Sequence, residues 1–175
     1  LAIETSTETC SVALSVNGDV LENYRHAPRQ HAELLLPWVE QLLANAGIGF
    51  SAVDAIAFSR GPGSFTSLRI GIGVVQGLAW AANRPVIPVS SLAATAQAAV
   101  ELGVESALVA LDARMNEVFT GTIEVNGKGL MVAASEEVVC SPGLVSAPAQ
   151  TETFGIGNGF DRYPALGELS GQLAG

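Results

Sequence analysis

Lysine is almost absent from this chain of 175 residues, in which Lys128 is the single example. Eight Lys and Arg residues stand against 17 Asp and Glu residues, so the formal net charge is −9 at pH 7. A protein that binds nucleic acid by itself neutralises phosphates with clustered Lys and Arg side chains. The composition therefore predicts that this chain does not bind nucleic acid directly.

Cysteine is scarce as well, with only Cys10 and Cys140 and no CxxC spacing. A disulfide framework needs more cysteines in a shorter chain, so we expect two buried thiols in a reducing cytoplasm. No apolar run approaches the ~20 residues of a membrane helix, because residues 70–82 are interrupted by three glycines and a glutamine. We therefore expect a cytoplasmic protein without a membrane partner.

Motifs for metal or nucleophilic catalysis are also missing from the sequence. His26 and His31 are the only histidines, HExxH spacing does not occur, and no serine has a plausible His–Asp partner. Disorder is excluded too, because 49% of the residues are hydrophobic and 14% are charged. The residues thus predict a folded protein with no metal ligands and no catalytic residues.

Residues 1–104 show the pattern of an α/β unit. Residues 1–27 alternate like a three-stranded meander, with the hairpin dipeptide Asn17-Gly18 at one turn. Helical spacing follows at residues 31–46, 66–82 and 90–102, and short apolar strands lie at 53–59 and 85–89. The order βββαβαβα favours a mixed sheet with helices on its faces.

A second unit is expected over residues 105–175. Strand patterns cover residues 107–112, 117–125 and 130–133, with a second hairpin dipeptide at Asn126-Gly127. Residues 154–159 are typical of a strand that leads into a glycine-rich turn. We expect this unit to be incomplete at its C-terminal end.

The most specific local feature is the loop at residues 61–66 (GPGSFT), between a strand and a helix. Glycines allow close backbone approach, and free N–H groups at a helix start can hold an anion. Gly61, Gly63, Ser64 and Arg69 are therefore candidate nucleotide or anion ligands. A tight strand-to-helix connection explains the same residues equally well.

Three further polar residues follow strands and have two readings each. Glu4 and Thr5 end the first strand, where a carboxylate and a hydroxyl suit Mg²⁺ and phosphate but also ordinary turn chemistry. Asp112 closes the strand that opens the second unit, and it fits either a polar cluster at a cleft or an exposed local ion pair.

Several separated segments together resemble the TsaB (YeaZ) family. They are residues 3–7 (IETST), 10–14 (CSVAL), 28–31 (PRQH), 61–71 (GPGSFTSLRIG), 88–92 (PVSSL), 112–119 (DARMNEVF) and 155–159 (GIGNG). The resemblance is strong over residues 1–120 and weaker beyond. It implies the two-lobed fold shared by actin, heat-shock ATPases and sugar kinases, each lobe built on a ribonuclease-H-like βββαβα core.

The resemblance also implies a role in making N6-threonylcarbamoyladenosine in tRNA. TsaB is similar to TsaD, the threonylcarbamoyl transferase, and pairs with it, while the ATPase TsaE joins them. TsaD holds its metal with a His-x-x-x-His segment, and the matching positions here are Ser91 and Thr95. Hydroxyls replace imidazoles poorly as transition-metal ligands, so the comparison implies an inactive paralogue of TsaD.

Two apolar helices offer the surface for this partnership. The expected interface residues are Leu35, Trp38 and Leu42 on one helix and Ile70, Val74 and Leu78 on the other. The same surface could form a homodimer when the chain is alone. Two alternatives stay open: a nucleotide-dependent phosphotransferase or glycoprotease-like peptidase, and a subunit that binds ATP or ADP only within the complex.

Overall fold

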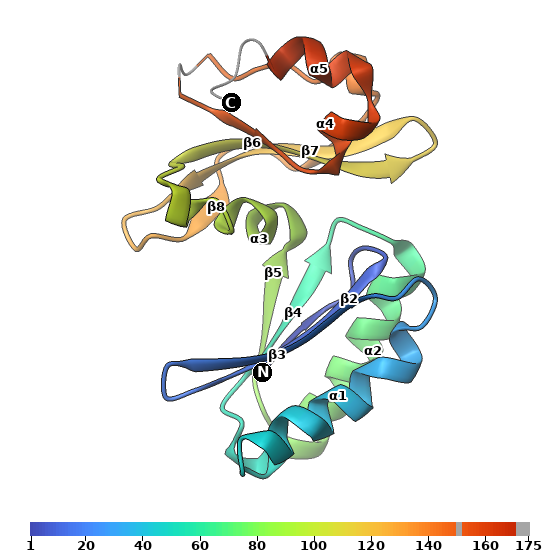
Figure 1. Ribbon diagram of the computed structural model, residues 1–175, viewed down its shortest axis with the longest axis vertical. Coiled ribbons are helices and arrows are strands. Elements are labelled where there is room, and N and C mark those ends of the chain that lie inside the picture. The colour runs from blue at the N-terminus through green and yellow to red at the C-terminus, as the bar shows by residue number, and fades with distance from the viewer. Residues whose placement is uncertain (150–151, 171–175) are drawn as a thin grey trace. The chain divides into compact units, whose positions relative to one another are not determined.

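The computed structural model describes residues 1–149 and 152–170 of the chain. Residues 1–90 form one compact unit, and the described residues from Ser91 onward form a second; the two are described separately below. Each unit is a mixed β-sheet with helices against it, as the α/β prediction requires (Figure 1).

The sheet of the first unit has the strand order β3-β2-β1-β4-β5. Its strands are β1 (Ala2–Glu4), β2 (Thr9–Val16), β3 (Asp19–His26), β4 (Ile56–Gly61) and β5 (Val86–Ser90). The first three form the predicted antiparallel meander, and β4 and β5 add to it in parallel. Asn17 has φ +54° and Gly18 has φ +96°, the positive angles that a two-residue hairpin turn needs.

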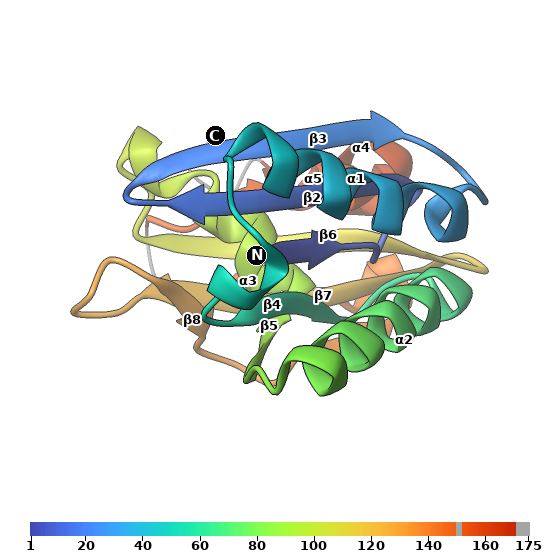
Figure 2. The ribbon, with the colours of Figure 1, turned by 90° about the horizontal axis from the view of Figure 1, so that it is seen from below.

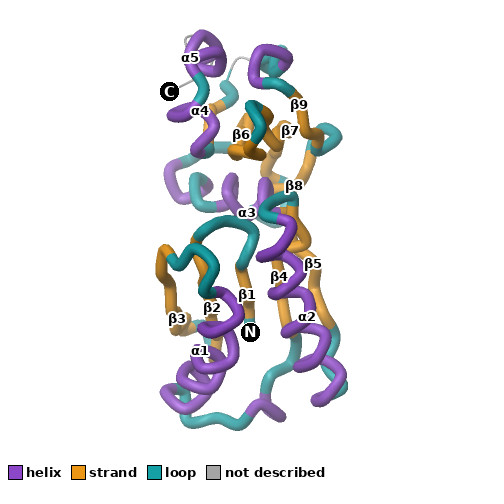
Figure 3. The backbone as a smooth tube through the Cα atoms, turned by 90° about the vertical axis from the view of Figure 1, so that its right-hand side faces the viewer, coloured by secondary structure: helices purple, strands orange, loops and turns teal. Residues whose placement is uncertain are grey.

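Helices α1 (His31–Asn45) and α2 (Phe65–Ala82) contact each other and cover one face of this sheet (Figures 1 and 3). Figure 2 shows α1 beside β2 and β3 and α2 beside β4, in agreement with their contacts. The short 3-10 turn η1 (Phe50–Ala52) connects α1 to β4. Val12 and Leu14 lie fully buried under the helices. Because side chains alternate between the two faces of a strand, these two residues of β2 both face the core.

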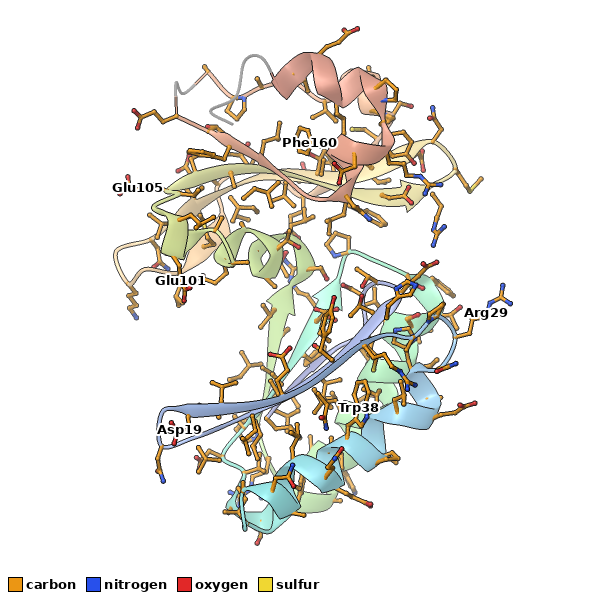
Figure 4. All side chains as sticks on the ribbon, in the orientation of Figure 1. Asp19, Arg29, Trp38, Glu101, Glu105 and Phe160 are labelled. Atoms are coloured by element: carbon orange, nitrogen blue, oxygen red, sulfur yellow. The ribbon has the colours of Figure 1, made fainter. Side chains whose placement is uncertain are left out.

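The second unit has a sheet in the order β10-β6-β7-β8, and β9 pairs with β7 as well. Its strands are β6 (Ser106–Arg114), β7 (Glu117–Val125), β8 (Met131–Ala133), β9 (Val138–Cys140) and β10 (Phe154–Ile156). Its helices are α3 (Ser91–Gln97), α4 (Asn158–Arg162) and α5 (Pro164–Ser170), with 3-10 turns η2 (Val100–Leu102) and η3 (Pro142–Leu144). Phe160, labelled in Figure 4, packs from α4 into a core cluster with Ala110 and Val118.

The division between the units falls earlier than the expected residue 104. Helix α3 contacts β6, β7 and β8, so its side chains belong to the second core. Leu92 and Ala96 on α3 are fully buried beside Val109 and Ile123. The spacing predicts a helix but does not reveal which sheet it covers, and assigning it to the first unit was therefore wrong.

Candidate functional site

The glycine-rich loop packs tightly against the turn that follows β1. A Cβ added at Gly63 would lie 2.3 Å from the backbone oxygen of Ser6. The N–H of Ser64 donates to that same oxygen over 2.7 Å. Gly61 precedes a Pro and has φ +96°, an angle that favours glycine. Glycine at position 63 therefore allows the backbone of Ser6 to pack closely against the loop.

Gly71, one of three glycines inside α2, also allows close packing against the turn that follows β1. A Cβ there would lie 2.3 Å from Oγ1 of Thr5, whereas at Gly73 and Gly77 it would meet nothing within 4 Å. Glycine lowers helix stability by about 1 kcal/mol relative to alanine. Close backbone approach thus explains Gly71, while Gly73 and Gly77 have no such explanation within the described part of the chain.

The polar groups after β1 are hydrogen-bonded locally. The Glu4 carboxylate accepts the N–H of Ser6, and the N–H of Thr5 donates to Oγ of Ser59 over 3.4 Å. The Arg69 guanidinium lies over the Phe65 ring, with its Cζ atom 3.2 Å from the ring centroid. The structure thus brings Glu4, Thr5, Gly63 and Ser64 together, and their observed contacts are those of a packed turn.

Asp112 lies in the other unit, at the centre of a polar cluster. Its side chain is only 7% exposed and accepts a hydrogen bond from Tyr163 Oη over 2.6 Å. The N–H of Arg114 donates to it over 3.0 Å, and Nε of Arg162 lies 3.4 Å away. Its own N–H donates to Oδ1 of Asn158 over 2.9 Å. These hydrogen bonds and ion pairs connect the end of β6 to α4.

Burial by itself raises the pKa of the Asp112 carboxyl. The hydrogen bonds from Tyr163 and Arg114, together with the charges of Arg162 and Arg114, lower it further than burial raises it, so the net pKa is below the usual value. The hydrogen bond to Asp112 raises the pKa of the Tyr163 hydroxyl. A carboxylate held in this way stays ionised at neutral pH, and its contacts hold the fold of the second unit.

Replacing Asp112 by alanine is expected to lower the free energy of unfolding by roughly 2–3 kcal/mol at pH 7, because several hydrogen bonds to a charged group are lost. Since the folded pKa is lowered, wild-type stabilisation is present above the ordinary carboxyl pKa and disappears as the pH falls through the folded value. Denaturant unfolding at pH 7 and pH 2.5 measures both. A difference between wild type and Asp112→Ala that is equal at the two pH values would contradict this role.

Ser91 and Thr95, the two positions expected to replace a metal site, both lie on α3. Thr95 Oγ1 donates to the backbone oxygen of Ser91 within α3, over 2.8 Å. Ser91 is 3% exposed, and its hydroxyl has no hydrogen-bond partner among the described residues. Over residues 1–149 and 152–170, no three His, Cys, Asp or Glu side chains gather as a metal site.

The prediction that Leu35 and Leu42 form an interface is wrong, because both residues lie in the core. Leu35 is 0% and Leu42 2% exposed, and both belong to the cluster under α1 and α2. Trp38, labelled in Figure 4, is partly buried on α1. The Cζ atom of Arg25 lies 6.0 Å from the centroid of its ring. Ile70, Val74 and Leu78 are also partly buried against the core. The apolar stripe of each helix thus faces mainly inward.

The opposite side of α2 was not predicted to be an exposed apolar surface. Its exposed residues are Phe65, Thr66, Arg69, Gly73, Gln76, Gly77, Trp80 and Ala81. The part called the outer face below consists of Phe65, Arg69, Gly73, Gly77 and Trp80. Trp80 is 91% and Phe65 71% exposed. The sequence signal for this face is that the helix is apolar nearly all round, because a helix that covers one sheet needs only one apolar stripe.

A concavity of about 640 Å³ lies at the other end of the first sheet. It is lined by Leu1, Ala13, Val16, Ile48 and Ile87, among others. These residues lie near the starts of β1 and β4, whereas Glu4 and Gly61 end those strands. The candidate ligand residues therefore do not line this cavity.

Comparisons with known proteins agree with the fold. Residues 21–153 match the family TsaD, tRNA N6-adenosine threonylcarbamoyltransferase. The chain is 44% identical to the tRNA threonylcarbamoyladenosine biosynthesis protein TsaB of Haemophilus influenzae, over 96% of this chain and 75% of that protein. It is 41% identical to the Escherichia coli TsaB, over 98% of this chain and 76% of that protein.

A solved structure has the same fold. YeaZ from Pseudomonas aeruginosa superposes with a TM-score of 0.87 and 51% identity, covering 91% of this chain and 76% of that one. The two mixed sheets and the matched relatives fit the actin-like fold built from ribonuclease-H-like units. On this evidence the chain belongs to the TsaB (YeaZ) family.

Proposed function

We propose that this chain is the non-catalytic subunit of the cytoplasmic complex that makes N6-threonylcarbamoyladenosine in tRNA, where it binds and activates TsaD. TsaE joins the pair, and the tRNA is held by partners because this chain has a net charge of −9. The names of its relatives support the pathway. The observation that carries the partnership is the exposed outer face of α2.

The outer face of α2 has the composition of a helix-pairing surface. Trp80 and Phe65 are large aromatic side chains left in water, and aromatic residues are enriched in the cores of interfaces. Gly73 and Gly77 lie between them with open space above. Small residues let a second helix approach closely, so the surface fits the apolar face of a partner helix.

By length and composition alone, α2 could cross a membrane, a test that core helices of soluble proteins also pass. Its inner side argues for a protein partner instead. Gly71 and Val75 are buried against the first unit, and α2 contacts β4 and α1. Because one face of α2 packs against the core, only its outer face is available to a partner. The charged Arg69 lies exposed on that face.

Co-expression with TsaD followed by size-exclusion chromatography tests the partnership. We expect a complex of one copy of each chain, and the same face would form a homodimer when TsaD is absent. Separate elution of the two proteins at micromolar concentration would contradict the proposal.

The enzyme alternative receives no support from the site, since the contacts of Glu4 and Gly63 are internal. We expect ATP and ADP not to bind the isolated chain, because the N–H of Ser64, a candidate anion donor, already donates to the backbone oxygen of Ser6. Isothermal titration with ADP and Mg²⁺ measures this, with and without TsaD. Binding to the isolated chain at micromolar concentration, lost in Glu4→Gln, would favour the enzyme reading.

A further inference from the structure

Arg69 is the single charged residue of α2, and it lies exposed on the outer face. A cation in the first half of a helix gains nothing from the helix dipole, whose positive end lies at the N-terminus. The positions one turn away on either side, 65, 66, 72 and 73, hold no carboxylate that could pair with it along the helix. Helix formation therefore does not explain a charge at this position.

The Arg69 side chain is held over an aromatic ring. Its Cζ atom lies 3.2 Å from the ring centroid of Phe65, which precedes it by four residues and is itself 71% exposed. Such a contact uses the face of the planar guanidinium, whereas the five N–H donors point outward in its plane. The ring therefore orders the side chain without using its hydrogen-bonding capacity.

The donors of Arg69 are not used within the described ranges 1–149 and 152–170, where it has neither an ion pair nor a side-chain hydrogen bond. Other arginines of the same unit do use theirs, since Arg25 donates to Oε1 of Gln30 and Arg84 donates to the backbone oxygen of Ser51. A helix that packs on the outer face would remove water from the Arg69 guanidinium, and an unpaired cation in such a contact is costly. The surface therefore favours a partner with an anionic group opposite Arg69.

We propose that Arg69 is a specificity-determining residue of the outer face of α2. Its guanidinium, held over Phe65, binds a carboxylate on the TsaD helix that packs over Gly73 and Gly77. The inference rests on the proposed function and names the chemistry of the partner. A preordered arginine loses little side-chain freedom on binding, and its fork matches a carboxylate through two parallel hydrogen bonds.

The same pairing distinguishes TsaD from a second copy of this chain. Residues 65–82 contain no Asp or Glu, so two α2 helices packed through their outer faces would leave both Arg69 side chains without a carboxylate. An unpaired charge in a contact disfavours the wrong partner. The need for a carboxylate therefore favours the heterodimer over a homodimer of this kind.

Binding to purified TsaD in nucleotide-free buffer, at about 50 and about 300 mM salt, tests the pairing. Arg69→Gln should bind at least about tenfold more weakly than the wild type at the lower salt, and the difference should shrink at the higher. Arg69→Lys keeps the charge but not the planar fork, so it should recover only part of the affinity. Lys128→Gln removes the same charge from an exposed residue of the second unit, and this matched control should bind like the wild type.

Phe65 acts as a positioning residue in this arrangement. Phe65→Leu keeps an apolar side chain but removes the ring under Arg69, whereas Phe65→Tyr keeps the ring and should bind like the wild type. The loss of affinity caused by Phe65→Leu should be at least about threefold smaller when Arg69 is already replaced by Gln. Equal losses in the two backgrounds would overturn the ring as the group that orders Arg69.

The outcomes separate this inference from the proposed function. Arg69→Gln binding within about twofold of the wild type, while Gly77→Arg loses pairing, would overturn the role of Arg69 and leave the proposed function standing. Equal losses in Arg69→Gln and Lys128→Gln would also overturn it, because net charge would then explain the effect. A loss that appears only after ADP is added would do the same, because the anion would then be a nucleotide. A wild-type chain that does not bind TsaD would overturn both proposals.

Discussion

Replacing Gly77 by arginine is expected to abolish pairing with TsaD without weakening the isolated chain. A side chain at this position meets nothing within 4 Å, so the fold has room for it. Arginine also forms helices better than glycine, by roughly 0.5–1 kcal/mol. The same side chain would stand between two helices that pair through small residues, and we expect affinity to fall at least about a hundredfold.

Size-exclusion chromatography and thermal unfolding, run on the same preparations, separate the two effects. Leu102→Arg is the matched control, because Leu102 is an apolar residue of the other unit and is 84% exposed. It should pair like the wild type. Undiminished pairing of Gly77→Arg would rule out the outer face of α2 as the interface.

Gly71→Val is expected to destabilise the protein strongly, whereas Gly73→Val is expected to be nearly neutral. The added side chain at Gly71 would overlap Thr5, whose Oγ1 lies 2.3 Å from the new Cβ. Overpacking of this kind costs about 1–3 kcal/mol, and backbone shifts in the turn after β1 add to it. Gly73 lies two residues further along the same helix and faces open space.

Urea unfolding of both variants gives the comparison directly. The helix propensity change is the same in both, so the difference between them reports the contact with Thr5 alone. A difference below about 0.5 kcal/mol would mean that the turn moves aside easily, and the packed-turn account of residues 61–71 would then be wrong.

The strand and helix order was predictable because each element has a clear local cause. Alternation along β2 and the Asn17-Gly18 turn predict the meander, and the spacing of Leu35, Val39 and Leu42 predicts α1. Both expectations are confirmed. The division at residue 104 failed because the partner of a helix depends on tertiary contacts, which no spacing along α3 reveals.

The candidate site was predictable only in part. Glycine at positions 63 and 71 indicates close approach, but the approaching atoms belong to Ser6 and Thr5 of the same chain. Leu35 and Leu42 are apolar in the same way as Trp80, so composition alone could not separate core from surface. The predicted nucleotide or anion role stays a prediction for all seven candidates, Glu4, Thr5, Gly61, Gly63, Ser64, Arg69 and Asp112.

Threonylcarbamoyl transfer to tRNA, measured with purified TsaD and TsaE, shows whether this chain is an activating subunit. We expect no product from this chain alone and little from TsaD and TsaE. Adding the wild-type chain should restore product, whereas adding Gly77→Arg should not. Product formed at the full rate without this chain, or by this chain in the absence of TsaD, would contradict its assignment as a non-catalytic activating subunit.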